Sequence, residues 1–135
     1  MDERITPEWI KELADNEIFV FGSNEAGRHG AGAAKLAMKW GAKYGKGFGI
    51  QGKTFALPTM DKNIHKLKID KVQFYVDGFT AIAIVTPTKN FLVTEVGCGL
   101  AGFKVKEIAP LFKVCSKLNN VYLPHKFWRV LNHED

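Results

Sequence analysis

The stretch IFVFGSNEAGRHGAGAAK, residues 18–35, decides the fold. Its first four residues are β-branched or aromatic, a pattern typical of a strand that is buried on both faces. A glycine-rich loop follows, and the alanine-rich run from Ala31 to Ala42 predicts a helix packed closely against another layer. A buried strand that enters a helix through such a loop indicates an α/β domain.

The rest of the chain continues this alternation of strands and helices. The helix over residues 69–85 competes with a hairpin turn at Asp77-Gly78, and we favour the helix because its apolar residues keep helical spacing. We predict a three-layer α/β/α fold with a mostly parallel mixed sheet, formed by residues 1–135 as a single domain. The further predicted strands are 54–57, 91–96 and 121–123, and the further predicted helices are 7–15, 105–118 and 125–131.

Composition limits the classes of protein to consider. Hydrophobic residues make up 46% of the chain and charged residues 24%, which is ordinary for a globular protein. No run approaches the ~20 apolar residues of a membrane span, and the first residues lack the apolar core of a signal peptide. We therefore expect a soluble cytoplasmic protein that binds no membrane. Its two cysteines, Cys98 and Cys115, are expected to be reduced, and neither a metal nor a cofactor is expected.

The charge of the chain is unevenly distributed. Lysine and arginine number 19 against 14 acids, and nine lysines lie between Lys35 and Lys71. Such a field attracts nucleotides or nucleic acid without identifying which. A solvated lysine surface is the simpler interpretation, because we do not expect the lysines to be interleaved with arginines or with exposed aromatic residues. A nucleic-acid-binding module remains an alternative function.

A second glycine-rich loop, VGCGLAGF at residues 96–103, follows the predicted strand 91–96. Glycines at a strand end let backbone N–H groups converge on an anion, which the positive end of the next helix also favours. In parallel sheets, ligands bind beyond the carboxyl ends of the strands. Both loops and Thr59 lie at such ends, so we predict one crevice that holds a diphosphate.

These loops resemble those of the macro domain family, whose members bind ADP-ribose and in some branches hydrolyse its derivatives. Gly22-Ser23-Asn24, with the run 30–34 that follows, is similar to the asparagine-bearing loop of the family. Residues 96–103 are similar to its diphosphate loop, in the version with Gly-Cys-Gly at the centre. The resemblance covers roughly residues 18 to 123. It implies a macro-like fold and a partner that is ADP-ribose, a related nucleotide or an ADP-ribosylated macromolecule.

Roles for individual residues follow from this resemblance. It implies that Asn24 contacts the distal ribose, that the backbone of residues 97–102 surrounds the phosphates, and that Phe103 packs beside the ribose. From its own chemistry, Arg28 suits bidentate bonds to phosphate, and Asn24 has the alternative role of capping the turn after its strand. The expected ligand-binding residues are Asn24, Arg28, Gly30, Ala31, Gly32, Thr59, Gly97, Cys98, Gly99, Leu100, Ala101, Gly102 and Phe103.

The sequence leaves enzymatic activity open. The strand end Leu57-Pro58-Thr59 looks like that of the hydrolytic branch, where a lysine follows the threonine and an acid lies in the second loop. Here Met60 and Ala101 occupy these places, and neither side chain can move a proton. Asp61 and Lys62 are nearby substitutes, and the acid that many macro domains use against adenine has no clear counterpart.

Three residues are weak catalytic candidates. Asn24 and His29 are candidates to hold a water molecule for the hydrolysis of a phosphorylated ribose derivative. Cys98 is a candidate nucleophile with His29 or His65 as its base, which gives a Cys98-dependent hydrolase as a further alternative. A small buried loop cysteine is the commoner role for such a residue.

Overall fold

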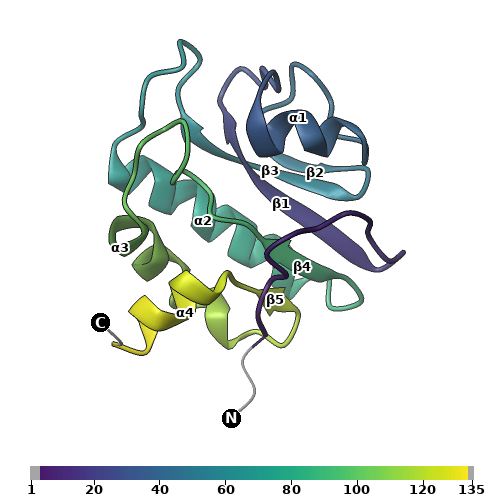
Figure 1. Ribbon diagram of the computed structural model, residues 1–135, viewed down its shortest axis with the longest axis vertical. Coiled ribbons are helices and arrows are strands. Elements are labelled where there is room, and N and C mark those ends of the chain that lie inside the picture. The colour runs from purple at the N-terminus through teal and green to yellow at the C-terminus, as the bar shows by residue number, and fades with distance from the viewer. Residues whose placement is uncertain (1–3, 134–135) are drawn as a thin grey trace.

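Strand β1 (Glu17–Asn24) lies in the middle of a five-stranded sheet, in the order β2-β3-β1-β4-β5 (Figure 1). The computed structural model describes residues 4–133. β1 pairs in parallel with β3 and β4, β4 pairs in parallel with β5, and only β2 runs antiparallel to its neighbour β3. The predicted mostly parallel mixed sheet is therefore confirmed. The other strands are β2 (Gly49–Gln51), β3 (Thr54–Met60), β4 (Asn90–Val93) and β5 (Val121–Tyr122).

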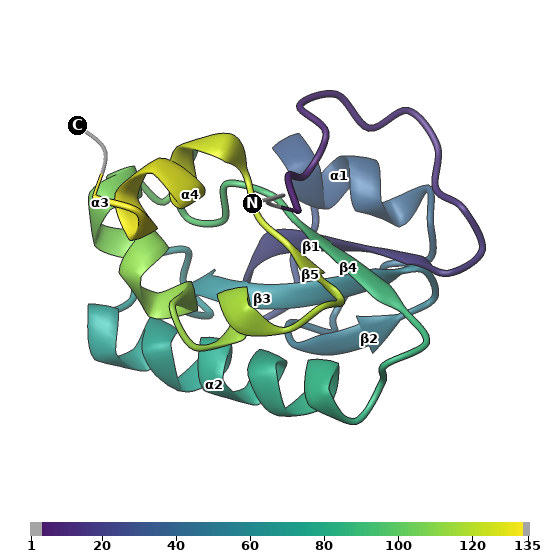
Figure 2. The same cartoon turned by 90° about the horizontal axis from the view of Figure 1, so that it is seen from below.

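Helices cover both faces of this sheet, as the predicted α/β/α layering requires. Helix α1 (Gly32–Met38) lies on one side of the sheet and α2 (Ile69–Ile84) on the other (Figure 2). Helix α3 (Val105–Ile108), the 3₁₀ turns η1 (Ala109–Phe112) and η2 (Cys115–Lys117), and helix α4 (His125–Leu131) follow along the chain. No helix between residues 4 and 133 is both long enough and apolar enough to cross a membrane.

The side chains of β1 explain why helices pack on both faces of the sheet. Ile18 and Val20 belong to the larger core, which also contains buried residues of α2, α3, η1 and α4. Phe19 and Phe21 point to the opposite face, into a smaller core with Ala34 and other residues of the α1 layer. These four side chains are all buried, which confirms the predicted two-sided strand. Neighbours along a strand face opposite ways, so one apolar run serves two cores.

The predicted helix over residues 7–15 is wrong. This segment is irregular and runs beside the sheet. The backbone N–H of Thr6 donates to the carbonyl oxygen of Leu123 at 2.9 Å. Ile10 and Leu13 pack against the smaller core. Contacts with the sheet and the smaller core, rather than local helix propensity, determine the backbone of this segment.

The C-terminal half confirms the predicted helices 69–85, observed as 69–84, and 125–131, and it corrects the predicted helix over residues 105–118. α3 ends at Ile108, and the 3₁₀ turn η1 begins at Ala109, because Pro110 has no N–H to continue the helical hydrogen bonds. Two strand boundaries also differ. β3 continues through Pro58 to Met60, whereas β4 ends at Val93. β2 had no sequence signal strong enough to predict it.

Candidate ligand-binding pocket

A pocket of about 380 Å³ lies beyond the carboxyl ends of β1, β3 and β4. In Figure 1 the chain leaves these three strands at the same end of the sheet, at the top. Both glycine-rich loops line the pocket together with the end of β3, as the strand order predicts. The lining residues are Gly22, Ser23, Asn24, Arg28, Gly30, Ala31, Gly32, Ala33, Ala34, Thr59, Met60, Ile64, Thr94, Glu95, Val96, Gly97, Gly99, Leu100 and Ala101.

Close backbone contact brings the two loops together. A Cβ atom at Gly22 would lie 3.2 Å from the amide nitrogen of Gly97, so only glycine at position 22 allows this approach without a shift. The pairing of β1 with β3 is also irregular between Ser23 and Asn24, at the edge of the pocket. The ends of β1 and β4 therefore meet directly, although far apart in the sequence.

The second loop presents amide groups without partners. Gly97 has a φ of +77°, a left-handed conformation that glycine adopts without strain. Inside the loop, the N–H of Phe103 donates to Gly97 and the N–H of Gly102 donates to Gly99. Between residues 4 and 133, the N–H groups of Gly97, Gly99, Leu100 and Ala101 make no hydrogen bond. These four residues line the pocket, so they offer hydrogen-bond donors to a ligand.

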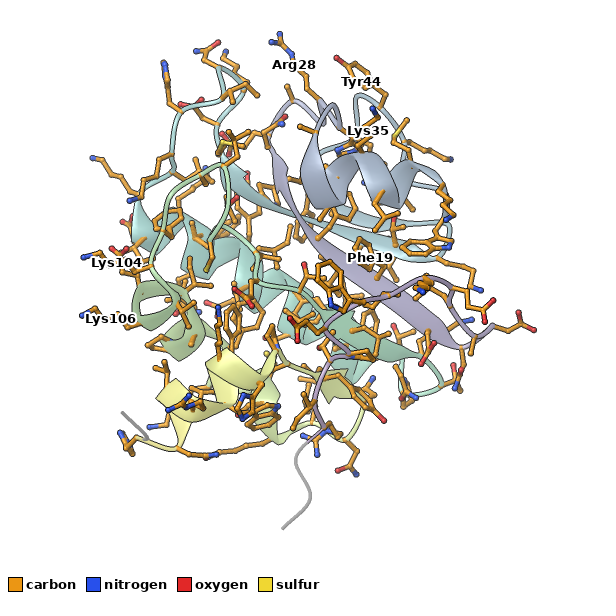
Figure 3. The ribbon with its side chains drawn as sticks, in the orientation of Figure 1. Phe19, Arg28, Lys35, Tyr44, Lys104 and Lys106 are labelled. Carbon is orange, nitrogen blue, oxygen red and sulfur yellow. The ribbon has the colours of Figure 1, made fainter. Side chains whose placement is uncertain are left out.

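The first loop leaves open space beside the pocket. A Cβ atom at Gly30 would meet no atom within 4 Å, and the same holds at Gly99. Arg28 is exposed at the pocket wall, and its side chain extends away from the body of the protein (Figure 3). Arg28 therefore stands at the entrance, where it can approach only the outer part of a ligand.

Asn24 serves the loop that contains it. Its carboxamide oxygen accepts a hydrogen bond from the N–H of Arg28 at 2.9 Å, and its amide nitrogen donates to the Arg28 carbonyl at 3.0 Å. The side chain lines the pocket but is only 4% exposed. Of its two predicted roles, the turn cap is confirmed. One hydrogen of the amide nitrogen remains for a ligand.

His29 does not line the pocket. Its ring is 3% exposed, packs edge-on against Phe21, and places Nε2 3.1 Å from the carbonyl oxygen of Lys46. Nδ1 is buried without a hydrogen-bond partner in the described chain. The hypothesis that His29 and Asn24 hold a catalytic water is therefore wrong for this arrangement, because the imidazole is enclosed between two loops.

Cys98, Gly102 and Phe103 are also absent from the pocket wall, contrary to the prediction. Cys98 packs against the larger core, and burial raises the pKa of its thiol to about 11. A thiol with so high a pKa is protonated at neutral pH, which argues against a nucleophile. Phe103 is a buried core residue, with the ammonium of Lys66 4.4 Å from the centre of its ring.

The residues that replace the expected lysine and acid, Met60 and Ala101, both line the pocket. Asp61 and Lys62 do not, and the Asp61 carboxylate accepts hydrogen bonds from the N–H groups of Asn63 and His65. These bonds lower the pKa of Asp61, with the bond from His65 making the largest contribution. Asp61 and Lys62 therefore do not take the places of the missing pair.

Nine lining residues were not among the expected ligand-binding residues: Gly22, Ser23, Ala33, Ala34, Met60, Ile64, Thr94, Glu95 and Val96. Of these, Ile64, Thr94 and Glu95 also lie outside the motifs that the sequence singled out. Thr94 and Glu95 directly follow β4, so applying the rule about strand ends to each residue would have found them. Ile64 comes from a loop outside the motifs and left no signal. Among the lining residues, Glu95 is the single carboxylate and Arg28 the single cation. The described residues contain no group of three His, Cys, Asp or Glu side chains placed to hold a metal ion.

Comparisons with known proteins show the fold and leave the ligand unassigned. No protein-family model matches the chain, and neither does any curated protein. A solved structure described as a protein of unknown function from Bacteroides thetaiotaomicron aligns with a TM-score of 0.58 and 16% sequence identity. The alignment covers 84% of this chain and 90% of that one. At this identity the similarity concerns the fold alone.

Proposed function

We propose that this protein binds ADP-ribose or a related nucleotide diphosphate in the pocket between its two glycine-rich loops. One observation carries the proposal: the loops after β1 and β4 line the same pocket, as a bound diphosphate requires. The volume of about 380 Å³ lies within the range of small-molecule sites, roughly 300–1,000 Å³. The resemblance of both loops to those of macro domains supports the choice of ligand.

The chemistry of the pocket wall supports an anionic ligand. The unpaired N–H groups of residues 97 and 99–101 are donors, and successive backbone amides in a turn form anion-binding concavities. The hydroxyls of Ser23 and Thr59 donate to backbone carbonyls, so in their present rotamers they offer mainly acceptor capacity. Backbone donors therefore supply most of the binding to phosphate.

The apolar part of the lining suits the rest of a nucleotide. Met60, Ile64 and Leu100 line the pocket, and Leu100 is 77% exposed. Burying such surface against a sugar or base contributes about 25 cal/mol per Å² of apolar area removed from water. We therefore assign the phosphates to the glycine loops and the nucleoside to these aliphatic side chains.

Hydrolysis of an ADP-ribose derivative is the second candidate function, and Glu95 is the observation that favours it. Its carboxylate makes no hydrogen bond or ion pair within the described residues, and it is the one acid in the lining. A free carboxylate can accept a proton from an attacking water. Release of acetate from O-acetyl-ADP-ribose by the wild type, and its loss in Glu95→Gln, would distinguish a hydrolase from a binding protein.

Titration calorimetry with ADP-ribose tests the proposal on Gly99→Val and Gly30→Val. A Cβ at either position meets no protein atom within 4 Å, so both variants should fold, while the valine side chain blocks the approach of a ligand to the backbone. We expect binding to fall at least about a hundredfold, equivalent to about 2.7 kcal/mol.

Ala81→Val is the matched control, because Ala81 is exposed on α2 and outside the pocket. It should bind ADP-ribose like the wild type. Unchanged affinity in both glycine variants, with their folding verified by circular dichroism, would refute the proposed site.

A further inference from the structure

The distribution of acids along the chain is highly uneven. The segment from Ala26 to Met60 contains neither aspartate nor glutamate, although the chain has 14 acids in all. The same segment forms α1, β2, β3 and the loops between them. Its basic residues are Arg28, Lys35, Lys39, Lys43, Lys46 and Lys53.

Folding gathers part of this segment at the mouth of the pocket. The N–H of Gly45 donates to the carbonyl of Gly27 at 2.8 Å. The carbonyl oxygen of Lys46 lies 3.1 Å from Nε2 of His29. The loop 43–47 is thereby attached to the loop that carries Arg28. We call the exposed residues of this region the basic rim: Arg28, Lys35, Lys43, Tyr44 and Lys46.

Helix α1 adds Lys35 to the rim. Ala34 and Ala37 face the smaller core, so the helical period turns Lys35 toward solvent. Figure 3 shows Arg28, Lys35 and Tyr44 on the α1 side of the protein, with Lys104 and Lys106 projecting from the opposite side. The contact between the loop 43–47 and the loop that carries Arg28 joins these residues, and Lys35 follows on α1.

Of the acids around this surface, Asp15 and Glu25 are already paired, whereas Glu95 lies unpaired in the pocket lining that it shares with Arg28. Asp15 lies before the amino end of β1, away from the pocket, and its carboxylate is 4.0 Å from the ammonium of Lys53. Glu25 accepts a hydrogen bond from Tyr75 and lies 3.7 Å from the ammonium of Lys71. No described acid pairs with Arg28, Lys35 or Lys43, so their charge is available to an anionic partner.

An aromatic side chain lies among these cations. Tyr44 is 65% exposed, and its hydroxyl makes no hydrogen bond within the described residues. A base can stack on an exposed ring while lysines hold the flanking phosphates, which is how proteins bind single strands without sequence preference. In a duplex the bases are already stacked, and an acidic peptide has no base to stack.

We propose that the basic rim is a docking surface for a single-stranded polynucleotide, with phosphates against the lysines and a base against Tyr44. This inference goes beyond the nucleotide site and does not depend on it. The rim adjoins the pocket mouth through Arg28, so a strand bound there passes the entrance.

Fluorescence anisotropy with a labelled oligothymidine of about 16 nucleotides tests the inference. The triple variant Lys35→Gln, Lys43→Gln, Lys46→Gln removes three rim charges outside the pocket lining. Each phosphate contact contributes about −0.7 to the slope of log affinity against log salt, so the triple variant should flatten that slope by about two. Its affinity at about 50 mM salt should fall at least tenfold.

The matched control is the triple variant Lys106→Gln, Lys113→Gln, Lys117→Gln. These lysines are exposed on and after α3 and η1, whose buried residues belong to the larger core, and their loss changes the net charge equally. We expect less than about a twofold loss of affinity, because their long-range field is screened over about 10 Å at moderate salt. Equal losses in the two triple variants would overturn the inference.

Three further measurements complete the test. Tyr44→Ala should weaken single-strand binding about fivefold or more. A duplex that binds as tightly as the single strand, or a polyglutamate chain that competes equally at matched charge, would overturn the assignment. No detectable binding by the wild type would do the same. Retained ADP-ribose affinity in the rim variant shows that its loss of polynucleotide binding is separate from the pocket.

Discussion

Asn24 closes the loop between β1 and α1 with both ends of its carboxamide, which bond the N–H and the carbonyl of Arg28. The loop thus has an internal hydrogen-bonded turn before it reaches Gly30. Cys98 likewise has a structural role, because its side chain packs against the larger core. Burial there raises the pKa of the thiol to about 11. At the scale of single residues, the candidate side chains therefore shape the loops, and the backbone provides the donors.

Asn24→Ala should destabilise the protein. Removing the carboxamide leaves the partly buried N–H and carbonyl of Arg28 without their partner, at a cost of about 1 kcal/mol. The free energy of unfolding from urea denaturation measures this. Asn119→Ala is the control, because Asn119 is exposed, and it should change stability by less than about 0.5 kcal/mol. An Asn24→Ala variant of wild-type stability that fails to bind ADP-ribose would show that the side chain serves the ligand instead.

Among the elements, the long and strongly patterned ones were predictable. The apolar run of β1 and the helical spacing of α2 predicted both correctly, since each buries its pattern within one element. The segment 7–15 has apolar residues at helical spacing, but contacts with the sheet and the smaller core determine its conformation. β2 exists because the edge of β3 is available for pairing, which no local pattern reveals.

Tyr75 on α2 ties this helix to the end of β1, because its hydroxyl donates to the carboxylate of Glu25. Tyr75→Phe should therefore lower the free energy of unfolding by about 0.5–1.5 kcal/mol at neutral pH. Burial, together with Glu25, raises the pKa of Tyr75 from 10.0 to about 12.

The raised pKa sets the pH dependence of this difference. A pKa that is higher in the folded state stabilises the protein below the pKa of the unfolded chain. The advantage of the wild type over Tyr75→Phe should thus be constant from neutral pH up to about pH 10 and fall as the pH rises from 10 toward 12. Tyr122→Phe serves as the control, because the Tyr122 hydroxyl makes no hydrogen bond within residues 4–133. Equal losses of stability in the two variants would contradict the role assigned to the Glu25 contact.

On the scale of the whole molecule, acidic residues are unevenly distributed along the chain, and the two cores lie on opposite faces of the sheet. Acids collect in the segment before β1, whereas the segment of residues 26–60 is free of them and reaches the pocket mouth. The carboxyl end of the sheet therefore carries both the unpaired amides and the basic rim. A polyanionic partner and a phosphate-containing ligand would approach the same end of the protein.

A thermal-shift series with ADP-ribose, ADP, NAD and AMP tests the pocket as a diphosphate site. A ligand that binds only the folded state stabilises it by about 2.7 kcal/mol at one hundred times its dissociation constant. At equal concentrations the three diphosphates should therefore raise Tm more than AMP, and Gly99→Val should abolish the differences. A shift with AMP as large as that with ADP-ribose would show that the second phosphate is not recognised.

Local chemistry alone determined the α/β class, the central strand, the long helix α2, the short helix α4 and the position of both glycine loops at strand ends. These follow from apolar periodicity and from the conformational freedom of glycine, which act within a few residues. Tertiary structure decided which loop residues line the pocket, why His29 and Phe103 do not, and where the lysines gather. Such outcomes depend on strand order and on contacts between residues distant in sequence, such as Gly22 against Gly97, which no local pattern encodes.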